Sequence, residues 1–130
     1  MRFPSVTRLV DCGVGTLFCV AVTTKILAGG SVVEEWTGGI GRHVASWVWW
    51  LADASVVAAE AYVGTALLVM GGRRVRRTAI ALLAVLLVAL TARGMLAGWS
   101  IRCACFGGVW ESSVSMAIVR NIVLCLFLLR

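Results

Sequence analysis

Charged residues are scarce in this 130-residue sequence: they make up 14% of it, whereas hydrophobic residues make up 61%. The mean hydropathy is +0.97. A soluble domain usually contains about 25% charged residues, because it must cover its surface with polar groups. The composition therefore excludes the soluble class and indicates a membrane protein with room for a single domain, 1–130.

Acidic residues are scarcer still, with six Asp and Glu against twelve Lys and Arg and a net charge of +6. In a soluble protein such a basic excess would suggest nucleic-acid binding. Here the arginines cluster where apolar runs end, which is their usual place in membrane proteins. We therefore expect no nucleic-acid partner, and the partner that the composition implies is the lipid bilayer.

The sequence also lacks the even set of closely spaced cysteines that holds small secreted domains together. It has five cysteines, of which only Cys103 and Cys105 form a local pair. The other three, Cys12, Cys19 and Cys125, lie in apolar runs. We expect them to be packing residues of transmembrane helices.

Four runs are apolar enough to be membrane helices, which need about 20 mainly apolar residues. We expect these helices over 9–28, 44–70, 78–99 and, somewhat shorter, 115–129. The basic start of the chain resembles a signal peptide, but no small-x-small cleavage site follows before Lys25, so we interpret the first run as a retained helix. The predicted fold is all-α, a four-helix transmembrane bundle.

The placement of arginine predicts how this bundle lies in the cell membrane. The break 71–77 holds four arginines, and short basic loops stay in the cytoplasm. Both termini are then cytoplasmic, and the segments 29–43 and 100–114 lie outside. All six tryptophans fall in or beside these outward segments, as expected of residues that favour the membrane–water interface. Cys103 and Cys105 are therefore expected on the oxidising, extracytoplasmic face.

Several polar residues interrupt the predicted helices, where an ionisable group costs roughly 2.5–3.5 kcal/mol at the centre and usually finds a partner. They are Lys25, Asp53, Glu60, Arg93, Arg120 and Asn121. One interpretation is an ion pair of Glu60 that pins the bundle. Another is a polar pocket beneath the cysteines, where Glu60, Arg93 and Arg120 favour a thiolate or bind an anion or a quinone oxygen. Lys25 and Asn121 would belong to the same pocket.

The segment 102–108 reads Arg-Cys-Ala-Cys-Phe-Gly-Gly and carries the clearest chemical pattern. The thiolate is the reactive form of cysteine, and Arg102 beside Cys103 favours it. A disulfide between Cys103 and Cys105 would close a small ring, and departures from relaxed disulfide geometry make such a bond easier to reduce. The pair is therefore suited to thiol–disulfide exchange, and its two cysteines are the candidate catalytic residues.

The residues by themselves leave other roles open for this pair. Cys103 and Cys105 could form a fixed disulfide that holds the loop. They could also be soft ligands for Cu(I), with His43 in the other outward loop and Met95 or Met116 as helpers. Palmitoylation does not fit their predicted extracytoplasmic position.

Three motifs accompany the four-helix pattern: Glu60-Ala61-Tyr62-Val63-Gly64, Cys103-Ala104-Cys105-Phe106-Gly107 and Arg120-Asn121. In this combination the chain resembles the MauE family of DoxX-like membrane proteins. The family signature usually reads Cys-Gly-Cys-Phe-Gly and is followed by Arg-Asp or Arg-Asn, and a lysine often stands where Lys25 does. Ala104 departs from this signature, and it makes a positive φ at that position less accessible than glycine would.

The resemblance implies a role in methylamine-utilisation-type systems, in which an exported partner acquires its disulfides with the help of a thioredoxin-like protein. Our first hypothesis is a membrane thiol–disulfide redox protein. Cys103 and Cys105 would exchange electrons with an exported thioredoxin-like partner or substrate protein, and with a membrane carrier such as a quinone. The alternative is a non-catalytic anchor or assembly subunit of a larger membrane complex, with Cys103–Cys105 as a structural disulfide. Copper handling at Cys103, Cys105 and His43 ranks below both.

Overall fold

The computed structural model describes residues 5–28, 45–97, 102–103 and 112–130. Over these residues the chain forms four helices, which confirms the predicted all-α class: α1 (Val6–Ala28), α3 (Ser46–Val69), α4 (Arg73–Ala97) and α5 (Val114–Leu129). Two strands of two residues each, β1 (Arg102–Cys103) and β2 (Ser112–Ser113), precede α5.

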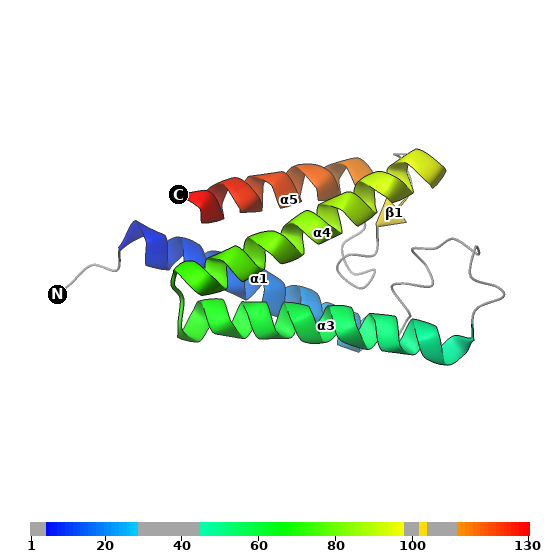
Figure 1. Cartoon of the computed structure of the whole chain (residues 1–130), viewed down its shortest axis with the longest axis horizontal. Coiled ribbons are helices and arrows are strands. Elements are labelled where there is room, and N and C mark those ends of the chain that lie inside the picture. Colours follow the sequence, from blue (N-terminus) through cyan, green and yellow to red (C-terminus); the bar gives the residue numbers. More distant parts are fainter. Residues whose placement is uncertain (1–4, 29–44, 98–101, 104–111) are drawn as a thin grey trace.

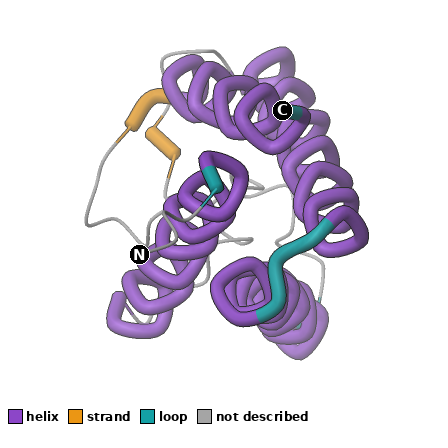
Figure 2. The backbone as a smooth tube through the Cα atoms, turned by 90° about the vertical axis from the view of Figure 1, so that its left-hand side faces the viewer, coloured by secondary structure: helices purple, strands orange, loops and turns teal. Residues whose placement is uncertain are grey.

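The four helices run up and down in an antiparallel bundle, as Figure 1 shows from the side and Figure 2 from one end. α1 packs mainly on α3 and α4 packs mainly on α5, while a tight turn joins α3 to α4. At one end of the bundle α1 begins, α5 ends and the α3–α4 turn lies; we call this the terminal end. At the other, the loop end, α1 and α4 end and α3 and α5 begin.

The α3–α4 turn is much shorter than predicted. α4 begins at Arg73 rather than at 78, because the break is confined to Gly71 and Gly72, whose φ angles are +58° and +98°. Glycine has no Cβ and adopts positive φ without strain, so the chain reverses within two residues and the arginines become the first turns of α4. The other predicted helices, 9–28, 44–70 and 115–129, agree with α1, α3 and α5 to within three residues at each end.

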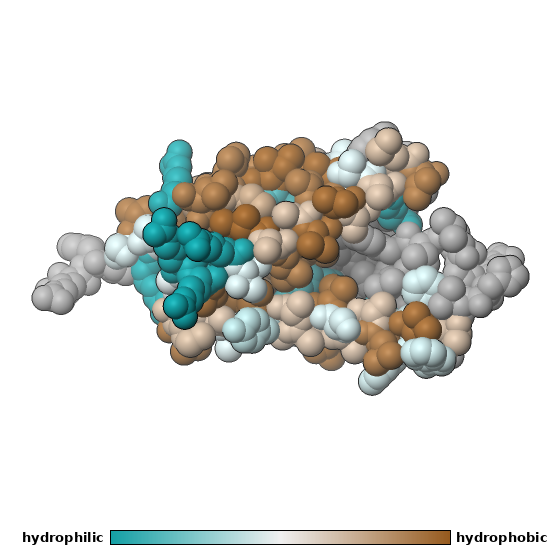
Figure 3. All heavy atoms as spheres, in the orientation of Figure 1, coloured by the Kyte–Doolittle hydropathy of each residue, from teal (hydrophilic) through white to brown (hydrophobic). Residues whose placement is uncertain are grey.

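The outside of the bundle is apolar. α1, α3 and α4 are each long and apolar enough to cross a membrane. α5 is apolar but has 16 residues, or about 24 Å, which is less than the ~30 Å hydrocarbon core of a bilayer. In Figure 3, apolar side chains cover the middle of the visible face and hydrophilic ones gather at the terminal end. This pattern is what a lipid-facing surface requires.

Two tryptophans mark the loop end of α3. Trp47 and Trp50 are 64% and 69% exposed and lie within the first five residues of the helix. This placement fits the aromatic belt expected at a membrane–water interface. Trp36, Trp99 and Trp110 lie outside the described residues, and the assignment of the loop end to the extracytoplasmic side stays a prediction.

Two glycines set the crossing of α1 and α3. A Cβ on Gly15 would lie 2.9 Å from the carbonyl oxygen of Gly64, and a Cβ on Gly64 would lie 3.1 Å from the carbonyl oxygen of Gly15. Small residues allow membrane helices to approach closely, and van der Waals packing then holds them together. The glycine pair therefore fixes the register of α1 against α3, on which the position of the polar residues depends.

The core has two parts. The larger cluster lies in the terminal half and comes from all four helices: Val14, Phe18, Val63, Leu67, Ala79, Leu83 and Leu128. The smaller one joins α4 to α5 nearer the loop end: Leu90, Val114 and Ala117. Buried polar residues accompany this apolar packing, and they are Asp11, Lys25, Glu60 and Asn121.

A short strand pair ties the segment after α4 to the start of α5. β1 pairs with β2 in antiparallel register, with Arg102 opposite Ser113 and Cys103 opposite Ser112. Ser113 is also the N-cap of α5, where its side-chain oxygen accepts a hydrogen bond from the backbone N–H of Met116 at 3.4 Å. The backbone of Cys103 therefore lies beside the N-terminus of α5, at the loop end of the bundle.

Candidate functional site

A buried ion pair joins α1 to α3. Lys25 Nζ lies 2.6 Å from both carboxylate oxygens of Glu60, and the exposed fractions of the two side chains are 5% and 6%. This contact supports the interpretation that Glu60 pairs with a basic residue inside the bundle. The partner is Lys25, which the sequence placed near the loop end of its helix without indicating which acid it meets.

The register of α1 and α3 explains why these two residues meet. Lys25 lies about 15 Å beyond Gly15 along α1, and Glu60 lies about 6 Å from Gly64 in the same direction, at 1.5 Å per residue. Helical side chains lean toward the N-terminus of their own helix. Because the helices are antiparallel, Lys25 leans back toward the glycine crossing and Glu60 leans away from it. The two long side chains thereby close an offset of about 9 Å between their backbones.

α5 brings two more predicted residues to this pair. Arg120 is partly buried and interacts electrostatically with Glu60. Asn121, its neighbour in the chain, is 3% exposed. The structure thus gathers Lys25, Glu60 and Arg120 into one group, which we call the charged cluster.

Two further charges that interrupt the predicted helices, Arg93 of the predicted pocket and Asp53, also lie toward the loop end. Arg93 stands one turn before the end of α4, partly exposed overall but with its Nε atom buried. Asp53 is partly buried in the first half of α3. The contribution of Arg93 to a pocket shared with Glu60 stays a prediction.

The cysteine motif falls largely outside the described residues. The structure gives the backbone of Arg102 and Cys103 in β1, whereas Cys105 and His43 lie outside the described ranges. Disulfide formation between Cys103 and Cys105 is therefore a prediction still, and so is copper binding with His43. Within the described ranges, no group of three or more His, Cys, Asp or Glu side chains is placed to hold a metal ion.

The other three cysteines behave as expected of packing residues. Cys12, Cys19 and Cys125 are free thiols and partly buried. Cys19 Sγ would lie 3.0 Å from a Cβ on Gly64, so it fills space at the α1–α3 crossing. Cys125 packs against the larger core cluster. None of these contacts assigns them a chemical role.

A second polar group, at the terminal end, was not predicted. Asp11 in α1 is 2% exposed and accepts two hydrogen bonds from Arg76 in α4, at 2.7 Å from Nε and 3.1 Å from Nη2. Arg76 Nη2 also donates to the carbonyl oxygen of Thr7 at 3.1 Å. The signal that could have found this pair is an acid within the first apolar run, since a buried carboxylate needs a cationic partner.

Arg8 completes this terminal group. Its guanidinium donates to the last carbonyl oxygens of α3, at 2.7 to 3.3 Å from those of Leu67, Leu68 and Val69. The final carbonyl groups of a helix have no partner within it and carry partial negative charge, so a cation here is stabilising. A Cβ on Gly71 would lie 2.5 Å from Arg8 Nη1, which is the end of a flexible side chain, so the positive φ is the main reason for glycine in this turn. The group locks α1 to the α3–α4 turn.

These features define an all-α membrane protein with a four-helix bundle and a charged cluster inside it. Residues 4–129, nearly the whole chain, match the family described as methylamine utilisation protein MauE. The chain therefore belongs to the MauE family, which confirms the resemblance carried by its motifs. Membership in this family is consistent with a membrane protein that takes part in methylamine utilisation. No curated protein and no solved structure gives a significant match.

Proposed function

We propose that this MauE-family protein is a membrane thiol–disulfide redox protein. Cys103 and Cys105 exchange electrons with an exported thioredoxin-like or substrate protein. The observation that carries the proposal is the strand pair, which holds the backbone of Cys103 beside the N-terminus of α5, the helix that also bears Arg120.

Two electrostatic effects would activate a cysteine at this position. The N-terminus of a helix carries partial positive charge, which favours a nearby thiolate. Arg120, on the same helix, would add a second positive contribution. Both effects favour the nucleophilic form of the cysteine, and this is the form that thiol–disulfide exchange requires.

The exchange can run in the direction that forms a disulfide in the partner protein. A partner thiolate attacks the Cys103–Cys105 disulfide, and the partner's second thiol then resolves the mixed disulfide. The partner loses two electrons and two protons, and Cys103 and Cys105 gain them as two thiols. Reoxidation of the pair needs an acceptor from the membrane, for which we propose a quinone.

The charged cluster and its neighbour suit such an acceptor. The guanidinium of Arg120 and the amide of Asn121 carry hydrogen-bond donors, and a quinone presents carbonyl oxygens that accept such bonds. When bound, the quinone would take up two electrons and two protons. Glu60, held by Lys25, would order these donors or relay a proton. The loop end would face the extracytoplasmic side, as the arginines of the terminal end favour.

Thiol trapping in intact cells tests the proposal. A maleimide reagent that adds mass is applied before and after mild reduction, and the labelling of Cys103 and Cys105 is followed by mass spectrometry. We expect both a dithiol and a disulfide state, with their ratio changing when respiration is blocked. A Cys19→Ser/Cys125→Ser variant serves as the matched control and should keep both states. If Cys103 and Cys105 are found in one redox state under every condition, the proposal is wrong.

A non-catalytic anchor or assembly subunit is the second candidate. The closed Lys25–Glu60 pair favours it, since such a pair can serve simply to hold α1 on α3. Replacing both Cys103 and Cys105 by serine separates the two functions. An anchor would still assemble its complex, whereas a redox protein would lose activity at unchanged expression.

A further inference from the structure

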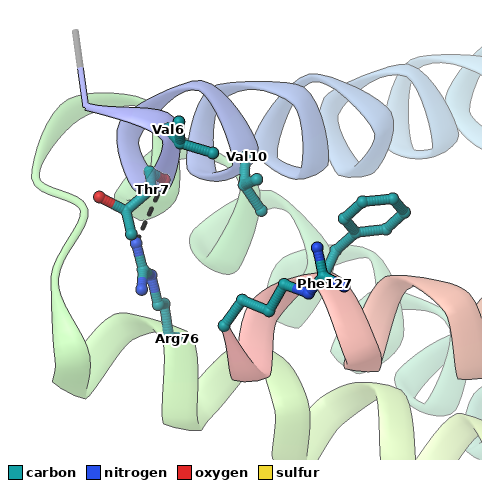
Figure 4. Close-up of a pocket in the computed structure, with 6 residues that line it drawn as sticks. Val6, Thr7, Val10, Arg76 and Phe127 are labelled. Carbon is teal, nitrogen blue, oxygen red and sulfur yellow. Dashed lines mark hydrogen bonds between the residues drawn. The ribbon is translucent and has the colours of Figure 1, made fainter.

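A small hollow opens at the terminal end of the bundle (Figure 4), whereas β1 and the charged cluster lie toward the loop end. Its volume is about 80 Å³, and its lining comes from α1, α4 and the end of α5: Val6, Thr7, Val10, Arg76, Phe127 and Arg130. It lies where α1 and α5 face each other, two helices that pack mainly on other neighbours. This volume is about half the ~150 Å³ of an engineered apolar cavity that binds benzene, so it suits a small group rather than a whole ligand.

The lining of the hollow is mostly apolar, with Val10 and Phe127 among the residues that form it. Arg76 and Arg130 add cationic side chains to this lining. The apolar span of α1 begins at Val6, so the hollow lies at the level where the apolar exterior meets the polar end. A ligand at this level would contact both an apolar and a charged environment.

The terminal end carries a surplus of positive charge. Arg76 uses Nε and Nη2 for Asp11 and the carbonyl oxygen of Thr7. Among the described residues, Asp11 is the one acid at this end, and no ion pair of the described part includes Arg130. Arg73, Arg74 and Arg77 are exposed on the adjoining turns of α4. An anionic group would therefore be attracted to the hollow.

We propose that this hollow binds the headgroup phosphate of an anionic phospholipid. Arg130 contacts the phosphate, and Phe127 and Val10 flank the first carbons of the lipid. The mixed lining favours a lipid over a free anion, because a free phosphate would gain nothing from the apolar residues. Basic pockets between membrane helices are suited to such headgroups. An arginine in contact with the headgroup strengthens binding by roughly fivefold, whereas exposed arginines farther away contribute less because salt screens them.

Native mass spectrometry of the full-length protein in detergent tests this proposal, with phosphatidylglycerol, phosphatidylcholine and inorganic phosphate as probes. We expect one phosphatidylglycerol molecule to be retained more tightly than phosphatidylcholine. Arg130→Gln should weaken this retention by roughly fivefold or more, while Arg74→Gln, which removes an exposed charge outside the lining, should change it by less than about twofold. Val6→Phe keeps every charge but adds bulk to the lining, and it should also weaken retention.

Three results would overturn the proposal. Equal losses for Arg130→Gln and Arg74→Gln would mean a diffuse basic surface instead of a site. Equal retention of the two lipids would remove the role of the anionic headgroup. Displacement of the lipid by inorganic phosphate at an equal concentration would indicate a site for free anions. Arg76 is left unchanged in all variants because it holds Asp11, and the melting temperature of each variant is measured as a check on folding.

Discussion

Lys25 Nζ lies 2.6 Å from both carboxylate oxygens of Glu60 and so links α1 to α3 within the bundle. The two side chains are almost fully buried, and the surroundings on either helix are apolar. Removal of Lys25 would leave the buried carboxylate of Glu60 without its ion-pair partner, whereas removal of both residues takes both charges of the pair out of the low-dielectric interior. This asymmetry makes the pair a direct test of the fold.

Lys25→Met should lower the free energy of unfolding by about 3–5 kcal/mol, the range for breaking a buried ion pair. The double variant Lys25→Met/Glu60→Leu should recover part of this loss, because the buried carboxylate is removed together with the ammonium group, although Arg120 then loses its attraction to Glu60. Denaturant unfolding in detergent micelles, followed by tryptophan fluorescence, measures both values. A double variant that is less stable than either single variant would contradict this interpretation.

Gly64→Ala should destabilise the bundle by about 1–3 kcal/mol, as overpacking of a tight interface does. The added methyl group would lie 3.0 Å from Cys19 Sγ and 3.1 Å from the carbonyl oxygen of Gly15. Gly13→Ala is the matched control, since a Cβ there meets nothing within 4 Å. It adds the same methyl group to α1 and should be neutral or slightly stabilising, because alanine favours a helix. Equal melting temperatures for the two variants would argue against the glycine crossing.

Arg8→Gln should loosen the α3–α4 turn. The charged hydrogen bonds to the end of α3 would be lost, which costs about 1.5–3 kcal/mol where the group is charged. Hydrogen exchange of the amides of Gly71 and Gly72 should become faster. Arg77→Gln removes an exposed arginine from the same end and should leave exchange at the turn unchanged.

Arg120→Gln should slow the alkylation of Cys103 in the reduced protein at neutral pH. The loss of a nearby cation lowers the fraction of thiolate, and a contribution of about 1 kcal/mol corresponds to a roughly fivefold lower rate. The rate should recover at high pH, where the thiol ionises without help. Arg130→Gln removes a charge from the opposite end and should have no effect. The prediction rests on the proposed redox function, and an unchanged rate would remove Arg120 from the proposed activation of Cys103.

The sequence indicated part of the charged cluster but not its contacts. Lys25, Glu60 and Arg120 were recognisable because each interrupts an apolar run. Their pairing depends on how each helix is rotated and how far it is shifted along its neighbour, and neither quantity follows from residue spacing within one helix. The ion pair of Asp11 with Arg76 could not be predicted either. Arg76 was expected in a loop, whereas it belongs to the first turns of α4.

The amino-acid sequence alone determined the class of this protein. Long apolar runs can bury their backbone hydrogen bonds only as membrane helices, and the motifs around Glu60, Cys103 and Arg120 led to the MauE family. Only the tertiary structure decided which charges meet. The close contact of Gly15 with Gly64 sets the register of α1 and α3, and the two-residue turn at Gly71 brings Arg76 back to Asp11. These contacts join segments that are far apart in the sequence. They depend on how the helices pack against one another, which the residue spacing within one helix does not determine.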